Sequence, residues 1–210
     1  MSQEETDPDP SPVDEELTED DVESSKMPLI EHLIELRNRL LWSIGALVVG
    51  FVLCYLVAEE MYRFLVQPLA DLMEGQPGRR MIYTALHEAF FTQLKVAFFG
   101  SVCLTFPIVA GQLWAFIAPG LYKKERRAFL PFLLATPILF VMGAALVYYL
   151  IFPLAWQFFM SFETAGAEGT LAIVMEPKVN EYLSLVMKLI FAFGLSFQLP
   201  VVLMLMARAG

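Results

Sequence analysis

Residues 96–127 read VAFFGSVCLTFPIVAGQLWAFIAPGLYKKERR. The first 27 of these residues are uncharged, and four cations and one acid follow them. A second uncharged run, residues 128–162, follows directly. An α-helix rises about 1.5 Å per residue, so roughly 20 apolar residues cross the hydrocarbon core of a bilayer. The stretch therefore predicts two membrane-spanning helices that are joined by a short basic loop.

Two further uncharged runs, 40–58 and 189–207, are just long enough to span a membrane. The chain is 57% hydrophobic and 18% charged, with a mean hydropathy of +0.58, which is too apolar for a soluble domain of 210 residues. We therefore expect an all-α polytopic membrane protein. Its four transmembrane helices are predicted at approximately 40–58, 92–118, 128–152 and 181–207.

Prolines inside these runs predict departures from straight helices, because each removes a backbone donor. Pro107 is expected to kink the second span and Pro200 to bend the fourth, while Pro153 is expected to mark the end of the third. After the first span, residues 59–74 place apolar side chains at roughly helical spacing, interrupted at Pro68. This pattern indicates short amphipathic helices on the outer membrane surface.

The first 26 residues are predicted to be a disordered acidic tail. Residues 1–23 hold 11 acids and no base, whereas the rest of the chain has 14 bases and 12 acids. An acidic segment with few apolar residues cannot bury enough surface to offset its ordering entropy. The negative net charge of the chain therefore comes from the tail. Residues 27–210 are expected to form the transmembrane domain.

The basic residues near the spans predict that the N-terminus is cytoplasmic, since cytoplasmic loops carry an excess of Lys and Arg. With this orientation eight cations lie on the cytoplasmic side, namely Lys26, Arg37, Arg39, Lys123, Lys124, Arg126, Arg127 and Arg208. The other side carries four, namely Arg63, Arg79, Arg80 and Lys178.

Two acids are expected at the cytoplasmic surface, and each has two interpretations. Glu35 lies four residues before Arg39, which is the favourable order for an ion pair within a helix. Glu125 lies inside the basic loop 122–127, and neutralising an exposed neighbour there contributes only about 0–1 kcal/mol. Alternatively, two carboxylates on one rim can receive two guanidinium groups, because arginine–carboxylate pairs can be bidentate. The residues alone leave both interpretations open.

Long stretches of the chain resemble TatC, the polytopic receptor subunit of the twin-arginine protein translocase. The matching stretches are HLIELRNRL (32–40), QPL (67–69), FPIVAGQLWAFIAPGLYKKERR (106–127), FPLAWQF (152–158) and NEYLSLVMKLIFAFGLSFQLPV (180–201). The resemblance implies a six-helix bundle with both termini cytoplasmic. Because this chain is predicted to hold four of the six helices, we expect it to be C-terminally incomplete.

The resemblance also implies a function. TatC proteins bind the twin-arginine signal peptides of folded precursor proteins at the cytoplasmic face of a prokaryotic inner membrane. They form the core of a multimeric export complex with small single-span subunits of the TatA/TatB type, and transport draws on the proton motive force. On this basis the chain is expected to be a translocase component in contact with lipid. It is not expected to be an enzyme, to hold a cofactor or metal, or to bind nucleic acid.

The resemblance further assigns site residues. The family's signal-peptide-binding glutamates fall on Glu35 and Glu125, with Leu36, Arg37 and Arg39 beside the first of them. Positions with structural or gating roles fall on Pro68, Pro107, Phe116 and Gln198. Many family members carry glutamate where this chain has Gln198, so an ionisable group is absent here. An amide can still join helices or take part in a partner site.

An ion-coupled transporter of small solutes is the alternative function. Such proteins usually keep ionisable groups or broken helices near the middle of the bilayer. In this chain the deep polar residues are Gln112 and Gln198, with Lys95 and Lys188 nearer the ends of their spans and Lys188 near an interface or facing protein. A membrane enzyme is less favoured still, because the spans contain no nucleophile–base pair and no metal-ligand set.

Overall fold

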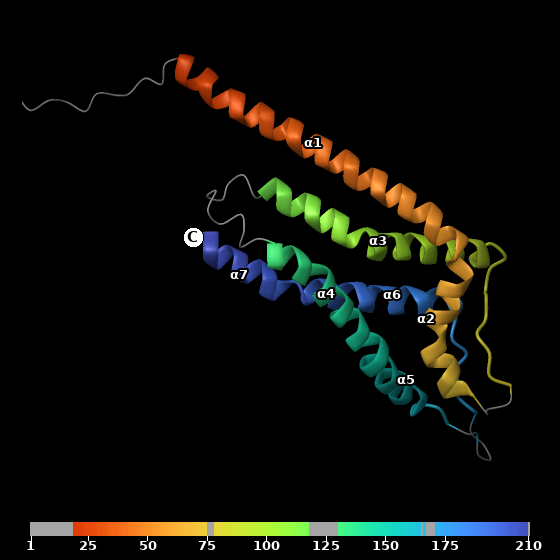
Figure 1. Cartoon of the computed structure of the whole chain (residues 1–210). Helices are drawn as coiled ribbons and strands as arrows, with labels where there is room; N and C mark the ends of the chain where they lie inside the picture. Colours follow the sequence, from red (N-terminus) through yellow and green to blue (C-terminus); the bar gives the residue numbers. More distant parts are fainter. Residues whose placement is uncertain (1–18, 75–77, 118–129, 165, 167–170, 210) are drawn as a thin grey trace, which may run out of the picture. The chain divides into compact units, whose positions relative to one another are not determined.

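The computed structural model of the chain describes residues 19–74, 78–117, 130–164, 166 and 171–209. The described residues are mostly helical (Figure 1). They contain four helical stretches that are long and apolar enough to cross a membrane, namely Ile30–Leu56, Glu88–Phe116, Leu134–Met160 and Val179–Met204. The predicted all-α class with four spanning helices is confirmed. The chain divides into two units, one ending at Asn38 and one beginning at Arg39.

The first unit holds the N-terminal part of helix α1 (Glu19–Leu56). Residues 19–26 are helical here, whereas the sequence predicts a disordered tail as far as residue 26. The acids that make this segment polar lie in the first turns of the helix, where negative charge interacts favourably with the helix dipole. Residues 1–18, the rest of the predicted tail, lie outside the described residues.

In the second unit, α1 packs against α3 (Glu88–Ile117) through small residues. A Cβ atom at Gly50 of α1 would lie only 2.8 Å from Thr105 Cγ2 of α3. The Ser101 hydroxyl donates a hydrogen bond of 2.7 Å to the Leu47 carbonyl across the same contact. Small side chains and hydrogen bonds of this kind are what hold helices together where no water is present.

Helix α2 (Ala58–Met73) is the amphipathic helix expected after the first span, but it continues through Pro68 instead of breaking there. Pro68 has no N–H for the Phe64 carbonyl one turn earlier. The Tyr148 hydroxyl donates a hydrogen bond of 2.8 Å to that carbonyl, and the Tyr148 and Phe64 rings stack with centroids 4.4 Å apart. The carbonyl that proline deprives of a donor thus has another partner, and the helix remains continuous.

The third spanning stretch is built from α4 (Leu130–Leu146), the π-helical turn η3 (Val147–Ile151) and α5 (Phe152–Met160). The prediction that Pro153 ends this span is wrong. The π turn widens the helix so that the Phe152 N–H bonds to the Val147 carbonyl five residues earlier. Pro153 then lies in the first turn of α5, where its missing N–H is tolerated.

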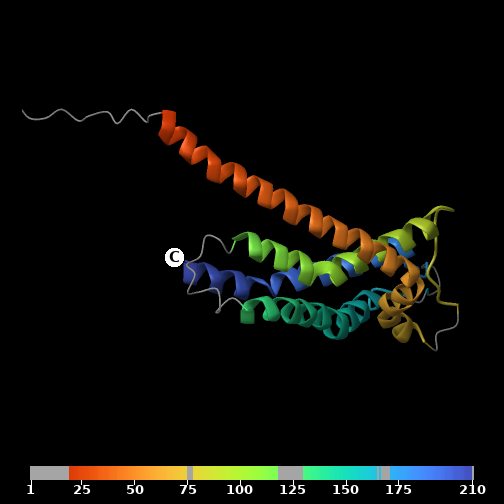
Figure 2. The same cartoon turned by 45° about the horizontal axis from the view of Figure 1, so that its top comes forward.

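The fourth spanning stretch comprises α6 (Val179–Ser196) and α7 (Leu199–Ala209). The two helices are separated by a turn at Phe197 and Gln198, and Pro200 is the second residue of α7. This is the bend that Pro200 predicts. Figures 1 and 2 both show α4 alongside α6, and α3 beside them.

The core of the second unit lies where α2, α3, η3, α5 and α6 meet. Its most deeply buried side chains are Leu69, Val96, Val147, Phe152, Val179, Leu183 and Val186. The Tyr182 hydroxyl of α6 donates a hydrogen bond of 3.0 Å to the Leu65 carbonyl of α2. Aromatic hydroxyls on two different helices therefore bond to adjacent carbonyls of α2, at Phe64 and Leu65.

Helices α4 and α6 approach most closely at two glycines. A Cβ atom at Gly143 of α4 would lie 2.7 Å from the Phe193 carbonyl oxygen and 3.0 Å from Gly194 Cα. On the opposite side of the contact, Gly194 of α6 leaves room for the ring of Phe140. The backbones of α4 and α6 can pack together at this crossing only because neither glycine carries a side chain.

We expect Gly143→Ala to lower the thermal stability of the detergent-purified protein. The new methyl group meets backbone atoms that cannot turn aside, and such overpacking typically costs about 1–3 kcal/mol. Gly45→Ala is the matched control in α1, because nothing lies within 4 Å of a Cβ atom built there. An equal loss of stability in both variants would contradict the close crossing.

The two segments that connect α2 to α3 and α5 to α6 are tied by an ion pair. The Arg79 guanidinium donates two hydrogen bonds to the Glu163 carboxylate, one of them 2.8 Å long, and both side chains are more than four-fifths buried. The Met175 N–H donates a further bond of 2.8 Å to the same carboxylate. Hydrogen bonds from Arg79 and then from Met175 hold the pKa of Glu163 below its ordinary value.

This ion pair predicts a pH dependence of stability. Because the pKa of Glu163 is lower in the folded than in the unfolded protein, its contribution is complete above the ordinary pKa of 4.5 and is lost as the pH falls through the lowered value. Thermal unfolding from pH 7 to pH 3 measures it. We expect Glu163→Gln to be less stable than the wild type at neutral pH, with the difference shrinking in acid. A difference that stays constant down to pH 3 would argue against the pair.

Candidate functional site

Three of the predicted signal-peptide-binding residues lie together in the first unit, on α1. The Glu35 side chain is 33% exposed, and its carboxylate lies 3.9 Å from His32 Nδ1. Leu36 is 42% exposed, and Arg37 is exposed and donates a hydrogen bond of 3.4 Å to its neighbour Asn38. This segment therefore presents an accessible carboxylate beside an accessible apolar side chain.

Arg39, the fourth of these residues, belongs to the second unit and has a long-range partner. Its guanidinium donates a hydrogen bond of 3.3 Å to the Gln112 side-chain oxygen of α3. Gln112 lies five residues before α3 ends at Ile117, so this contact fixes Arg39 near the end of α3 that leads into the basic loop. Phe116, in the last turn of α3, is partly buried.

Glu125 lies within residues 118–129, outside the described residues. The expected pairing of Glu35 with Glu125 on one surface therefore remains a prediction. Pro107, one of the predicted structural residues, is exposed in α3, and that helix bends along its length in Figures 1 and 2. Pro68 is buried in α2, in the setting described above.

Gln198 is buried at the break between α6 and α7. Its side-chain amide donates a hydrogen bond of 2.8 Å to the Thr136 carbonyl of α4. The Gln198 side-chain oxygen is also buried, and it has no hydrogen-bond partner within the described residues. The amide thus joins the broken fourth span to the third, which is the interhelical role that the sequence suggests for it. The unpaired oxygen leaves the second interpretation, a partner site, open.

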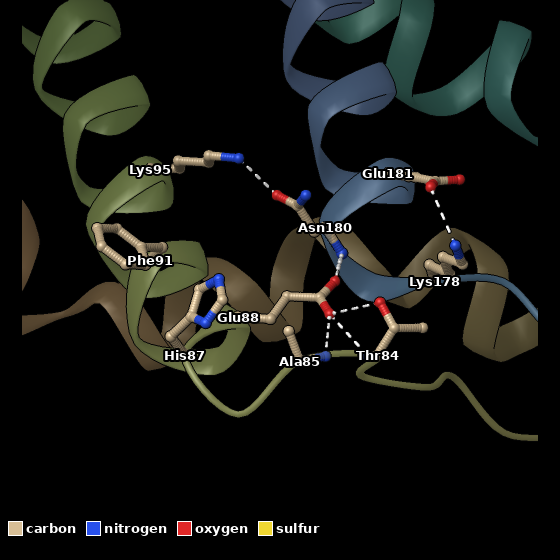
Figure 3. Close-up of a pocket in the computed structure, with 9 residues that line it drawn as sticks. All are labelled: Thr84, Ala85, His87, Glu88, Phe91, Lys95, Lys178, Asn180 and Glu181. Atoms are coloured by element: carbon tan, nitrogen blue, oxygen red, sulfur yellow. Dashed lines mark hydrogen bonds and ion pairs between the residues drawn. The ribbon is translucent and has the colours of Figure 1, made fainter.

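One polar site was missed by the sequence reasoning. A cavity of about 350 Å³ lies where α3 and α6 begin, and Glu88 is at its base (Figure 3). The Glu88 carboxylate accepts hydrogen bonds from the Thr84 N–H at 2.7 Å, the Ala85 N–H at 3.3 Å and the Asn180 N–H at 3.3 Å. Glu88 therefore caps the beginnings of two helices. Thr84 and Glu88 are four residues apart, whereas the capping-box pattern has a spacing of three, so no sequence rule marks this cap.

Two further pairs of polar side chains line this cavity. Lys95 Nζ donates a hydrogen bond of 2.5 Å to the Asn180 side-chain oxygen, and Lys178 lies 3.5 Å from Glu181 (Figure 3). A carboxylate that already accepts from several donors is a poor base, so the arrangement favours positioning of the helices over catalysis. Within the described residues, no group of three or more His, Cys, Asp and Glu side chains has the geometry to hold a metal ion.

Comparison with known proteins gives one consistent result. The family model for Sec-independent protein translocase protein (TatC) matches residues 31–210. A relative from Magnetococcus marinus, named Sec-independent protein translocase protein TatC, is 55% identical over 190 residues, which cover 90% of this chain and 67% of the relative. The protein of the same name from Escherichia coli strain K12 is 40% identical over 183 residues, covering 87% of this chain and 68% of that protein.

The structure agrees with the sequences. A crystal structure of the twin-arginine translocase receptor TatC in DDM superposes with a TM-score of 0.72 at 33% sequence identity, over 85% of this chain and 76% of that one. A second crystal structure of that receptor also gives a TM-score of 0.72, at 34% identity. The sequence match extends across all four spanning stretches and the fold coincides over most of the chain, so the protein belongs to the TatC family of Sec-independent protein translocase proteins.

Proposed function

We propose that this chain is a twin-arginine signal-peptide receptor and the core membrane component of a Tat complex. The complex exports folded proteins across the cytoplasmic membrane and draws on the proton motive force. The observation that carries this function is the likeness in both fold and sequence to a solved twin-arginine translocase receptor. The chain is a multi-pass protein of the bacterial inner membrane, and the comparisons favour this function over ion-coupled transport of small solutes.

The proposed binding site uses Glu35 and Glu125 as acceptors for the two arginines of the signal peptide. The accessibility of Glu35 on α1 supports its part. A guanidinium can form two parallel hydrogen bonds to a carboxylate, so a pair of acids suits a pair of arginines better than it suits lysines. Leu36 is exposed beside Glu35 and offers apolar contact to the hydrophobic part of a signal peptide.

The positive residues near this site have a positioning role in the proposal. Arg39 bonds to Gln112 and so ties α1 to α3, one helical turn beyond Glu35. Arg37 and the cations of the basic loop repel non-specific cationic segments, which makes the two acids selective. With the N-terminus in the cytoplasm, all of these residues face the compartment from which precursors arrive. Small single-span subunits of the TatA/TatB type are the proposed further partners, and no enzymatic step is assigned to the chain.

Substituting Glu35 or Glu125 by alanine is expected to weaken cross-linking of a twin-arginine precursor to membranes that contain the protein. A hydrogen bond to a charged group contributes about 1.5–3 kcal/mol, so each substitution should reduce binding roughly tenfold or more. Lysine at either position should be more damaging, because it adds repulsion. Photo-cross-linking with a precursor that carries the probe next to its arginine pair provides the measurement.

The matched control is Glu31→Ala, which removes an exposed acid four residues from Glu35 on the same helical segment. This variant should cross-link like the wild type. A precursor in which both arginines are replaced by lysine should lose its sensitivity to the two glutamates. Undiminished cross-linking in both Glu35→Ala and Glu125→Ala would refute the proposed two-carboxylate site.

A further inference from the structure

The cavity at Glu88 lies where two spans meet a membrane surface. Glu88 is the first residue of the second spanning stretch, and Val179 is the first residue of the fourth. The cavity is lined from both beginnings, by Glu88 and Phe91 of α3 and by Asn180 of α6 (Figure 3). Because the hydrocarbon core of a bilayer is bordered by polar headgroups, a cavity at the starts of two spans lies at the level of those headgroups.

Lys95 brings a positive charge to this cavity from farther along α3. It lies seven residues after Glu88, about 10 Å along the helix axis, yet its ammonium group bonds to the side-chain oxygen of Asn180, the second residue of α6. The side chain therefore extends back toward the membrane surface, as long cationic side chains near the ends of spanning helices do. This bond places the ammonium group beside the first turn of α6.

The charge of Lys95 is not balanced by an acid. Its partner Asn180 is neutral, and Lys95 forms no ion pair within the part of the chain that the structure describes. The Glu88 carboxylate is already occupied, because it accepts three backbone hydrogen bonds and one from the Thr84 hydroxyl at 3.2 Å. An ammonium group has three N–H donors, and Lys95 uses one of them on Asn180. It can therefore donate to an anion without releasing α6.

Lys178, the residue before α6, is a second donor in the same cavity. Its ammonium group lies 3.5 Å from the Glu181 carboxylate, and the two side chains are 44% and 72% exposed. Ion pairs exposed to this degree are weak, so a competing anion can take up the Lys178 ammonium group. A phosphate group has several acceptor oxygens, so it suits two lysines that reach one cavity from α3 and from the start of α6.

Apolar side chains lead from the cavity toward the membrane interior. Phe91, Lys95 and Phe98 follow one another at intervals of four and three residues, so they lie on one face of α3. Both phenylalanine rings are slightly more than half exposed, and Phe98 is farther along the span than Lys95. On α6, Leu185 is 41% exposed one turn after Glu181. A ligand with a charged head and apolar chains can use both parts of this surface, whereas a free anion can use the charged part alone.

We propose that the cavity is a binding site for a phospholipid. Its phosphate accepts hydrogen bonds from Lys95 and Lys178, and an acyl chain lies along Phe91 and Phe98. Basic pockets between spanning helices are sites where lipid headgroups bind. The lipid joins α3 to α6 at the end where Glu88 already caps both, so it adds to the contact between the second and fourth spans. None of the residues proposed to bind signal peptides takes part, and the site does not depend on that function.

Native mass spectrometry of the full chain in detergent, titrated with dioleoylphosphatidylglycerol, measures the binding. We expect one lipid to be retained in preference to dioleoylglycerol, which has the same chains but no phosphate. A hydrogen bond between two charged groups is strong enough that Lys95→Gln should weaken retention about tenfold or more, and Lys178→Gln should weaken it as well. Lys95→Arg should bind like the wild type. Glutamine can still donate to Asn180, so loss in Lys95→Gln with retention in Lys95→Arg reports the charge and not misfolding.

Lys188→Gln is the matched control, because it removes an exposed lysine of α6 that does not line the cavity. This variant should retain the lipid like the wild type. Equal retention of the two lipids would overturn the proposal, as would an equal loss in Lys95→Gln and Lys188→Gln, which would reflect a general attraction to cations. Inorganic phosphate is the third probe, and displacement of the lipid by phosphate at an equal concentration would assign the cavity to a free anion and overturn the lipid site.

Discussion

The second unit depends on one constraint: where a helix continues through a proline, the carbonyl that the proline leaves without a donor needs another one. Pro68 has no N–H to donate to the Phe64 carbonyl, and the Tyr148 hydroxyl from another helix donates a hydrogen bond to it instead. Tyr148 lies in the π-helical turn that also admits Pro153. Two prolines and one tyrosine thus join α2 to the third span. The core of Leu65, Leu69, Phe152 and their neighbours assembles around that junction.

Much of this architecture could be predicted, because long uncharged runs leave the chain no other way to bury its backbone. The number of spans and the amphipathic helix after the first of them follow from that pattern. What the pattern could not show is whether a proline ends a helix. Pro153 and Pro68 were expected to end or interrupt helices, and both lie within continuous helical stretches. The carbonyl that Pro68 leaves without a donor bonds to Tyr148, which is remote in sequence, and Pro153 is accommodated by a local π-helical turn. Of these three prolines, Pro200 is the one that coincides with a break.

In the candidate site, too, features of a local segment could be predicted, whereas contacts between residues far apart in the sequence could not. Glu35 could be singled out because its segment is short, polar and periodic, and the structure leaves it accessible. The bond from Arg39 to Gln112 joins residues 73 positions apart, and no spacing rule predicts such a contact. Glu88 was missed for the same reason, since one of its donors is Asn180 on α6. Contacts between helices depend on which faces meet, and that is decided by packing rather than by periodicity.

Gln198 shows how one substitution limits mechanism. The resemblance to TatC implies glutamate at this position in many family members, and an ionised carboxylate can accept hydrogen bonds but cannot donate them. In this chain the side-chain amide donates to the Thr136 carbonyl, and it does so without taking up or releasing a proton. A carboxyl group could make the same bond only when protonated, so in this chain the link between the third and fourth spans is independent of pH. Any coupling of transport to protons must therefore act through another group in this protein, while the amide of Gln198 holds the broken fourth span against α4.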